Sequence, residues 1–274
     1  MFGKTKEMTE VKEVKKVTKV KAGIAFGGGG TRGFAHIGAL KAFEECGIEF
    51  SHVAGTSVGA IMASCYACGK KSFELIDIIK TVRKKDIKNS KLFFVSSNSA
   101  NIEKLVYSAI GDKTFEEVNK PLAVVAVDLI SGDEVVLRNG PIAKAASASC
   151  AVPGIFSPVK YGFYHLVDGG LANPIPSDVL RTMGAEVVIS IDLNSVRGNG
   201  TNSTRFLDVI FATFRIAMKS TAIKGIVNSD IMINPDLSKF KATSLDGMEE
   251  MIQIGYDATM AQMSNIRELL RIKK

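Results

Sequence analysis

The chain has 274 residues, of which 46% are hydrophobic and 23% are charged, and its formal net charge is +7. This hydrophobic content is normal for a folded globular protein and excludes a disordered chain. The chain has no uncharged apolar run of the roughly 18 residues that a membrane-spanning helix needs. We therefore expect a single folded domain over residues 21–274.

The first 20 residues are rich in lysine and lack the apolar segment of a secretory signal peptide. We interpret them as a basic, solvated leader. Without a signal or a membrane span, we expect a cytoplasmic protein, with peripheral contact at the inner membrane surface as a further option. We expect the four cysteines to be reduced core thiols rather than metal ligands, because no second C-x-x-C pair accompanies Cys65 and Cys68.

The first part of the chain predicts a strand over 19–26, a glycine run, and a helix that ends at Gly47. A second strand over 48–55 and a second helix, ending near Gly69, follow. A strand–helix–strand unit of this length is a right-handed crossover, so the two strands should be parallel. If they are neighbours, the glycine run and the turn at 55–59 lie at the same carboxyl edge of the sheet, where α/β proteins place their chemistry.

The rest of the chain continues this alternation. Strands are predicted over 121–129, 132–140, 164–170, 185–193 and 229–237, and helices over 141–150, 176–184, 205–224 and from about 245. The alternation predicts an α/β fold of three layers, α/β/α, with a mainly parallel central sheet. The helix over 205–224 is amphipathic, and we interpret it as a core-packing element.

The glycine run, Gly27 to Gly30, has three interpretations. A dinucleotide fingerprint fits Gly28 to Gly33, but the second strand has no acid at its end to bind a ribose. A phosphate loop fails because the required Gly-Lys-Ser/Thr is missing. The remaining interpretation is that bare backbone N–H groups near a helix start point at an oxygen that carries charge during a reaction, with Arg32 fixing the loop or adding positive potential.

The second strand supports that interpretation, because it runs into a G-x-S-x-G sequence, Gly55 to Gly59. Between a strand and a helix this pattern makes a sharp turn that exposes the serine hydroxyl, here Ser57, above the sheet. A serine nucleophile also needs a base and donors for its oxyanion. The glycine run suits the second role.

The base is predicted by the positions of the acids and histidines. All three histidines, His36, His52 and His165, precede residue 166, and each is interpreted as structural. A triad in α/β-hydrolase order needs a histidine after the acid, so a carboxylate must act instead. Asp168 is the leading base, since it ends a predicted strand and is followed by the permissive Gly169 and Gly170.

The segments GGGGTRG (27–33), GTSVG (55–59) and DGG (168–170) resemble, in order and spacing, the patatin-like phospholipase family of bacteria, and SASCAVPGIFSPV (147–159) adds to the resemblance. It covers residues 22–192, with 193–274 adding C-terminal helices and a strand. The resemblance implies a Ser57–Asp168 catalytic dyad and an oxyanion hole of N–H groups at Gly28, Gly29 and Gly30. It implies no metal or cofactor.

In this interpretation the supporting residues of the site are Arg32, Gly33, Gly55, Gly59, Gly169 and Gly170. The expected function is a lipid acyl hydrolase, a phospholipase- or lysophospholipase-like serine esterase, whose partner is a phospholipid or another acyl-ester lipid and not a nucleic acid. The alternatives are an acyl transferase or thioesterase with the same dyad, and a non-catalytic lipid- or nucleotide-binding module. The basic, aromatic segment over 83–95 suits membrane docking, although an inward-packed surface loop fits it as well.

Overall fold

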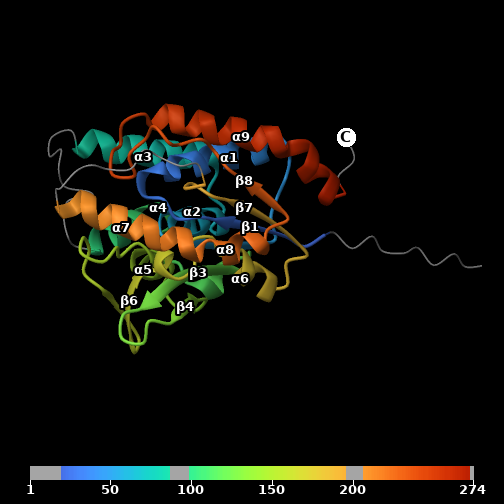
Figure 1. The fold of residues 1–274 in the computed structure, drawn as a ribbon. Coiled ribbons are helices and arrows are strands. Elements are labelled where there is room, and N and C mark those ends of the chain that lie inside the picture. Colours follow the sequence, from blue (N-terminus) through green and yellow to red (C-terminus); the bar gives the residue numbers. More distant parts are fainter. Residues whose placement is uncertain (1–19, 87–98, 196–205, 272–274) are drawn as a thin grey trace, which may run out of the picture.

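The computed structural model describes residues 20–86, 99–195 and 206–271 (Figure 1). The predicted leader and most of the predicted docking segment over 83–95 lie outside these ranges. Within these described ranges, no helix is both long enough and apolar enough to cross a membrane.

A single sheet runs through the middle of the described structure. Its central five strands, in the order β3-β2-β1-β7-β8, are mutually parallel. They are β3 (Leu122–Asp128), β2 (His52–Thr56), β1 (Ala22–Phe26), β7 (Val187–Ile191) and β8 (Ile231–Ile233). The predicted parallel pairing of β1 with β2 is therefore confirmed, and the loops after both strands leave the sheet at the same edge.

Three antiparallel strands extend the sheet beyond β3. They are β4 (Glu134–Leu137), β5 (Val159–Tyr161) and β6 (Tyr164–Asp168), and both β4 and β6 pair with β3. Since β4 overlaps along β3 with both β2 and β6, it occupies one edge of β3, and β2 and β6 share the other. Thr56, the last residue of β2, pairs with Val125, and Asp168, the last residue of β6, pairs with Ala126. Strands that run in opposite directions thus meet end to end beside β3.

Helices cover both faces of this sheet and confirm the predicted three layers. One face packs against α1 (Phe34–Glu45), α2 (Val58–Ala67) and α5 (Ile142–Ser149), and α4 (Ala100–Ile110) packs on α2 and α5. The long C-terminal helix α9 (Met248–Leu269) lies along the outer side of α1 (Figure 1). These two helices can approach closely because each has a glycine at the contact. A Cβ at Gly38 would overlap the backbone of α9, and a Cβ at Gly255 would overlap the backbone of α1.

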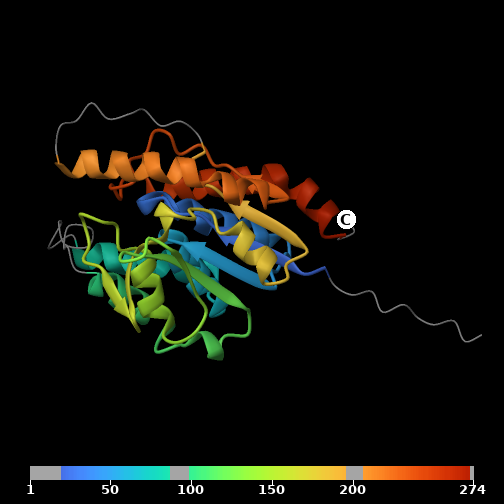
Figure 2. The ribbon, with the colours of Figure 1, turned by 60° about the horizontal axis from the view of Figure 1, so that its bottom comes forward.

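The opposite face of the sheet packs against α6 (Ser177–Thr182). The contact is made by small and branched side chains that alternate along the strands with those facing the other layer. The predicted helix over 205–224 is divided into α7 (Phe206–Thr221) and α8 (Ile223–Val227), and α7 lies at the outside of the molecule (Figure 2). The sequence analysis did not assign α3 (Ser72–Asp86) and α4, which lie between the second and third central strands. Three short 3-10 segments complete the described elements: η1 (Gly30–Gly33), η2 (Phe115–Glu117) and η3 (Gly169–Leu171).

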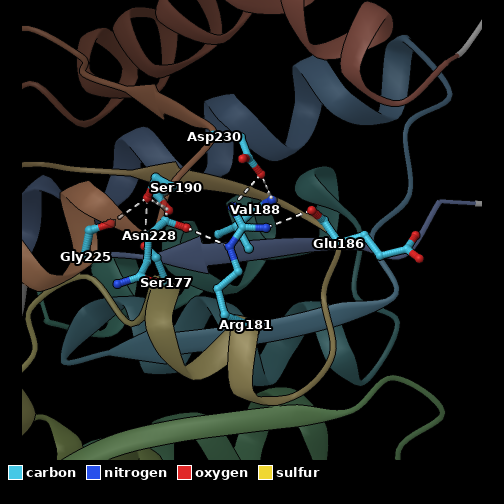
Figure 3. A network of polar contacts seen from close by, with 9 residues as sticks. Ser177, Arg181, Glu186, Val188, Ser190, Gly225, Asn228 and Asp230 are labelled. Atoms are coloured by element: carbon cyan, nitrogen blue, oxygen red, sulfur yellow. Dashed lines mark hydrogen bonds and ion pairs between the residues drawn. The ribbon is translucent and has the colours of Figure 1, made fainter.

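A polar network ties α6 to β7 and to the segment between α8 and β8 (Figure 3). Its centre is a serine triangle, Ser177, Ser190 and Ser229, whose hydroxyl oxygens lie 2.7–2.9 Å apart. Ser229 donates to the Gly225 carbonyl, so each hydroxyl has an acceptor. Beside the triangle, the Arg181 guanidinium contacts carbonyl oxygens and pairs with the Asp230 carboxylate at 2.7 Å.

Candidate active site

Ser57 lies in a sharp turn between β2 and α2. Its backbone has φ 57° and ψ −128°, a region that residues with a side chain rarely adopt. The two flanking glycines make the turn possible: a Cβ at Gly55 would overlap the Gly59 carbonyl, and a Cβ at Gly59 would overlap the Phe26 carbonyl. The strained backbone conformation therefore falls on Ser57, as it does on the serine of the G-x-S-x-G turns between a strand and a helix.

Neighbouring hydroxyl groups hold this turn in place. The Ser57 amide donates to Ser149 Oγ at 2.8 Å, and Ser149 Oγ donates to the Val125 carbonyl of β3 at 2.5 Å. Thr56 Oγ1 donates to the Asn173 carbonyl at 2.8 Å. The sequence analysis did not single out Ser149; it lies in the small-residue segment over 147–159, whose serines offered the only signal.

Asp168 lies directly beside Ser57. Ser57 Oγ donates to Asp168 Oδ2 at 2.7 Å, and the Gly170 amide donates to Asp168 Oδ1 at 2.8 Å. Asp168 is fully buried and Ser57 is 7% exposed. Both carboxylate oxygens thus have donors, but among the described residues no cation forms an ion pair with this carboxylate.

Burial without a cation changes the acidity of Asp168. Desolvation raises the pKa of its carboxyl to about 7, and the hydrogen bonds from Ser57 and Gly170 oppose that rise. A carboxyl group with a pKa near neutrality can both accept and return a proton at physiological pH, as a general base requires. Cys150 lies near this carboxylate, and burial first, then the Asp168 charge, raises the pKa of its thiol, so the thiol stays protonated. All four cysteines are free.

The glycine run passes over Ser57: a Cβ at Gly28 would lie 3.2 Å from Ser57 Cβ. Its first two N–H groups already have acceptors, since Gly27 donates to the Ile191 carbonyl and Gly28 to the Pro174 carbonyl, each at 3.0 Å. Within the described part of the chain, the N–H groups of Gly29 and Gly30 have no acceptor. The amide of Gly28, predicted as a third oxyanion donor, is thus engaged elsewhere, and two of the three predicted donors remain available.

Arg32 fixes the glycine run rather than facing Ser57. Its guanidinium donates twice to the Phe240 carbonyl, at 3.0 and 2.8 Å, and once to Asn194 Oδ1 at 3.3 Å. Asn194 Nδ2 in turn donates to the Gly28 carbonyl at 2.8 Å. Neither Asn194 nor Phe240 was singled out from the sequence, because both lie more than 160 residues from the loop that they hold.

The three histidines have other contacts. His36 is buried, and because Nε2 contacts the Gly27 carbonyl at 2.8 Å, Nε2 must carry the proton. Burial lowers the pKa of His36 to about 4, so the ring is neutral and supports the glycine run from beneath. His52 Nδ1 contacts Ser51 Oγ at 2.9 Å, and His165 lies on the exposed part of β6. Within the described structure, none of the three forms a hydrogen bond with Ser57.

The remaining predicted residues pack around Ser57 and Asp168. Gly33 lies against Val58 of α2, and Gly169 lies against the Val125 backbone, where a Cβ would overlap each neighbour. Met218 of α7 covers the site, since its Cε lies 3.1 and 3.2 Å from the positions where Cβ atoms of Gly28 and Gly170 would be. Across the described ranges, no three His, Cys, Asp or Glu side chains lie close enough together to hold a metal ion.

Three comparisons bear on the identity of the chain. The family model described as patatin-like phospholipase matches residues 24–181. An uncharacterised NTE family protein of Mycobacterium tuberculosis is 25% identical over 91% of this chain and 47% of its own length. The Drosophila melanogaster protein named neuropathy target esterase sws is 26% identical over 85% of this chain and 19% of its own length. The chain thus spans about half, or less, of the length of these curated relatives.

The crystal structure of VipD from Legionella pneumophila has a similar fold, with a TM-score of 0.54 at 15% identity, over 90% of this chain and 67% of that chain. The family model spans more than half of the chain and includes both the glycine run and the turn at Ser57. The resemblance seen in the sequence is therefore confirmed: this chain belongs to the patatin-like phospholipase family.

Proposed function

We propose that this chain is a lipid acyl hydrolase that cleaves carboxylic esters through Ser57 and Asp168. The observation that carries the proposal is the 2.7 Å hydrogen bond from Ser57 Oγ to the buried Asp168 Oδ2. Membership of the patatin-like phospholipase family supports a lipid ester as the substrate.

In the first half of the proposed reaction, Asp168 Oδ2 accepts the Ser57 proton as Ser57 Oγ attacks the ester carbonyl carbon. The oxygen of the tetrahedral intermediate takes up negative charge, which the free N–H groups of Gly29 and Gly30 stabilise. Collapse of the intermediate breaks the bond to the alcohol, and Asp168 returns its proton to that leaving oxygen. The product of this half is an acyl-Ser57 ester and a free alcohol.

In the second half, Asp168 accepts a proton from water, whose oxygen attacks the acyl carbon of the Ser57 ester. Collapse of the second intermediate releases the fatty acid, and Asp168 returns the proton to Ser57 Oγ. A carboxyl pKa of about 7 suits both steps, because the group takes up and gives back one proton in each half.

The experiment that tests the proposal is labelling with a fluorophosphonate probe beside turnover of a p-nitrophenyl ester. We expect wild-type chain to be labelled and active, Ser57→Ala to lose labelling, and its turnover to fall by roughly 10⁴-fold or more. Ser190→Ala is the matched control, since Ser190 is also a buried serine and belongs to the serine triangle. Labelling that persists in Ser57→Ala would disprove the assignment.

The same assay separates the alternatives. A non-catalytic binding module would show neither labelling nor turnover. An acyl transferase would release the acyl group to an added alcohol acceptor in preference to water, whereas a hydrolase should yield free fatty acid. A thioesterase would favour acyl thioesters over the matching oxygen esters.

A further inference from the structure

A row of apolar side chains follows the outer side of α7 and α8. Its members recur at alternating intervals of three and four residues, with Thr213 and Ser220 at two of the positions. The apolar members are Phe206, Val209, Ile216, Ile223 and Val227. Their exposed fractions run from 45% at Val209 to 71% at Val227. This spacing places such residues on one side of a helix, and here that side is exposed to solvent rather than packed on the core.

The inner side of the same helix packs over the dyad. Met218 is 6% exposed and lies against the backbone of Gly28 and Gly170, next to Ser57 and Asp168. The outer row is thus separated from the proposed nucleophile by about one helix diameter, roughly 10 Å. The sequence analysis interpreted this helix as a core-packing element, and that interpretation accounts only for its inner side.

The charges along the row are mostly basic. Between residues 206 and 227 the chain has three basic residues, Arg215, Lys219 and Lys224, and one acidic residue, Asp208, near the start of the row. Lys224 pairs with Glu134 and Asp178 at 2.7 Å each, whereas Lys219 is exposed beside the row. An apolar row flanked by cations fits the boundary between the acyl chains and the anionic headgroups of a bilayer. A twofold contact between two copies centred on the middle of this row would instead bring Lys219 of each copy toward the other.

We propose that the outer row of α7 and α8 docks on a lipid bilayer that contains anionic headgroups. The inference rests on the proposed function, since a lipid substrate explains why a docking surface lies on the helix that covers Ser57. This docking surface is distinct from the segment over 83–95, for which membrane docking stays a prediction from the sequence.

Co-sedimentation with vesicles tests this proposal, using the full chain and two compositions, phosphatidylcholine alone and equal parts phosphatidylcholine and phosphatidylglycerol. We expect wild-type chain to bind the mixed vesicles more tightly. The double variant Ile216→Ser, Ile223→Ser should lose about tenfold or more in partitioning, because two apolar side chains no longer enter the bilayer. Lys219→Gln should lose about fivefold, on the anionic vesicles only. Phe73→Ser is the matched control, since Phe73 is 63% exposed on α3.

The readouts separate this proposal from the proposed function. Ser57→Ala should bind vesicles like wild type, and the double isoleucine variant should keep its turnover of a water-soluble p-nitrophenyl ester while losing hydrolysis of vesicle lipid. If wild-type chain binds neither kind of vesicle, or if the double variant binds as well as wild type, the proposed docking surface is wrong. Neither result would contradict the proposed reaction at Ser57. A double variant that only converts a dimer to a monomer in sedimentation velocity would assign the row to a contact between copies, and would also overturn the proposed docking surface.

Discussion

Two clusters of buried or half-buried serines lie in this molecule, and they differ in what surrounds them. In the serine triangle (Ser177, Ser190 and Ser229; Figure 3), the hydroxyl groups contact one another and a carbonyl oxygen. At the candidate site, Ser57 and Ser149 form a chain of hydrogen bonds that includes a buried carboxylate, Asp168. The triangle contains only neutral groups, and its charged neighbours, Arg181 and Asp230, pair with each other.

The backbone differs as well. Ser57 has a positive φ, whereas Ser177, Ser190 and Ser229 are absent from the non-glycine residues with that conformation. A strained backbone and an uncompensated buried charge both lower stability, and proteins retain such features where function requires them. Burial of a serine is thus a poor guide to its role. A strained backbone at the serine and a neighbouring carboxylate without an ion-pair partner are better guides.

The sharpest test of this contrast is Asp168→Asn, because it removes the charge and keeps the shape. Ester turnover should fall by roughly 10³–10⁴-fold, as expected when a nucleophile loses its base. Steady-state kinetics with a p-nitrophenyl ester measures the loss, and retained circular dichroism shows that the variant is folded. Turnover close to that of wild type would show that Asp168 is not the base. The neighbouring carboxylate would then no longer distinguish the candidate site from the serine triangle.

The second test uses pH, since the pKa of Asp168 is raised to about 7. A carboxyl group whose folded pKa lies above its unfolded value near 3.8 binds its proton more tightly when folded, so stability falls as pH rises from about 4 to 7. The loss should reach roughly 4 kcal/mol above pH 7. Over the upper part of that range turnover should rise, because Asp168 must be deprotonated to act as a base.

Urea unfolding and ester turnover measured across this pH range check both trends, with Asp168→Asn as the reference. The amide of the variant does not ionise in this pH range, so the difference in unfolding free energy between wild type and variant should change over the same range. A difference that stays constant would show that Asp168 is already charged at acidic pH, and that its environment resembles that of an ordinary surface acid.

A third test concerns the support of the strained turn. Ser149→Ala removes the hydroxyl that accepts from the Ser57 amide and donates to the Val125 carbonyl. We expect kcat to fall by about tenfold with KM nearly unchanged, because the nucleophile loses its orientation and not its substrate contacts. Burst kinetics separates acylation from deacylation. If KM rose and kcat held, Ser149 would belong to substrate binding instead.

The smallest expected effect on activity comes from the serine triangle. Ser190→Ala removes a hydroxyl that contacts both Ser177 and Ser229, which should lower the free energy of unfolding by about 1–3 kcal/mol. Ester turnover should stay within about twofold of wild type, because the triangle has no contact with Ser57 in the hydrogen bonds described. Equilibrium unfolding beside kinetics measures both. A large loss of turnover at full stability would show that the two clusters are coupled.

Much of the fold was predictable because local patterns carry it. The buried strands of the central sheet, the crossover between β1 and β2, and the turn at Ser57 follow from hydrophobic runs and from glycines at fixed spacing. The helix pair α3 and α4 was missed, as no glycine motif or neighbouring strand drew attention to residues 72–110. The break between α7 and α8 was also missed, since the amphipathic pattern continues across it.

Local sequence patterns predicted the chemical groups and the local turns: a hydroxyl between two glycines, a carboxylate at a strand end, and a run of bare amides. Contacts between distant segments bring these groups together. Asp168, 111 residues from Ser57, comes next to it because β2 and β6 share one edge of β3. The Gly28 amide is engaged because the Pro174 carbonyl accepts from it, while among the described residues the amides of Gly29 and Gly30 have no acceptor. Strand pairing and hydrogen-bond partners depend on distant parts of the chain, and short-range sequence patterns do not record them.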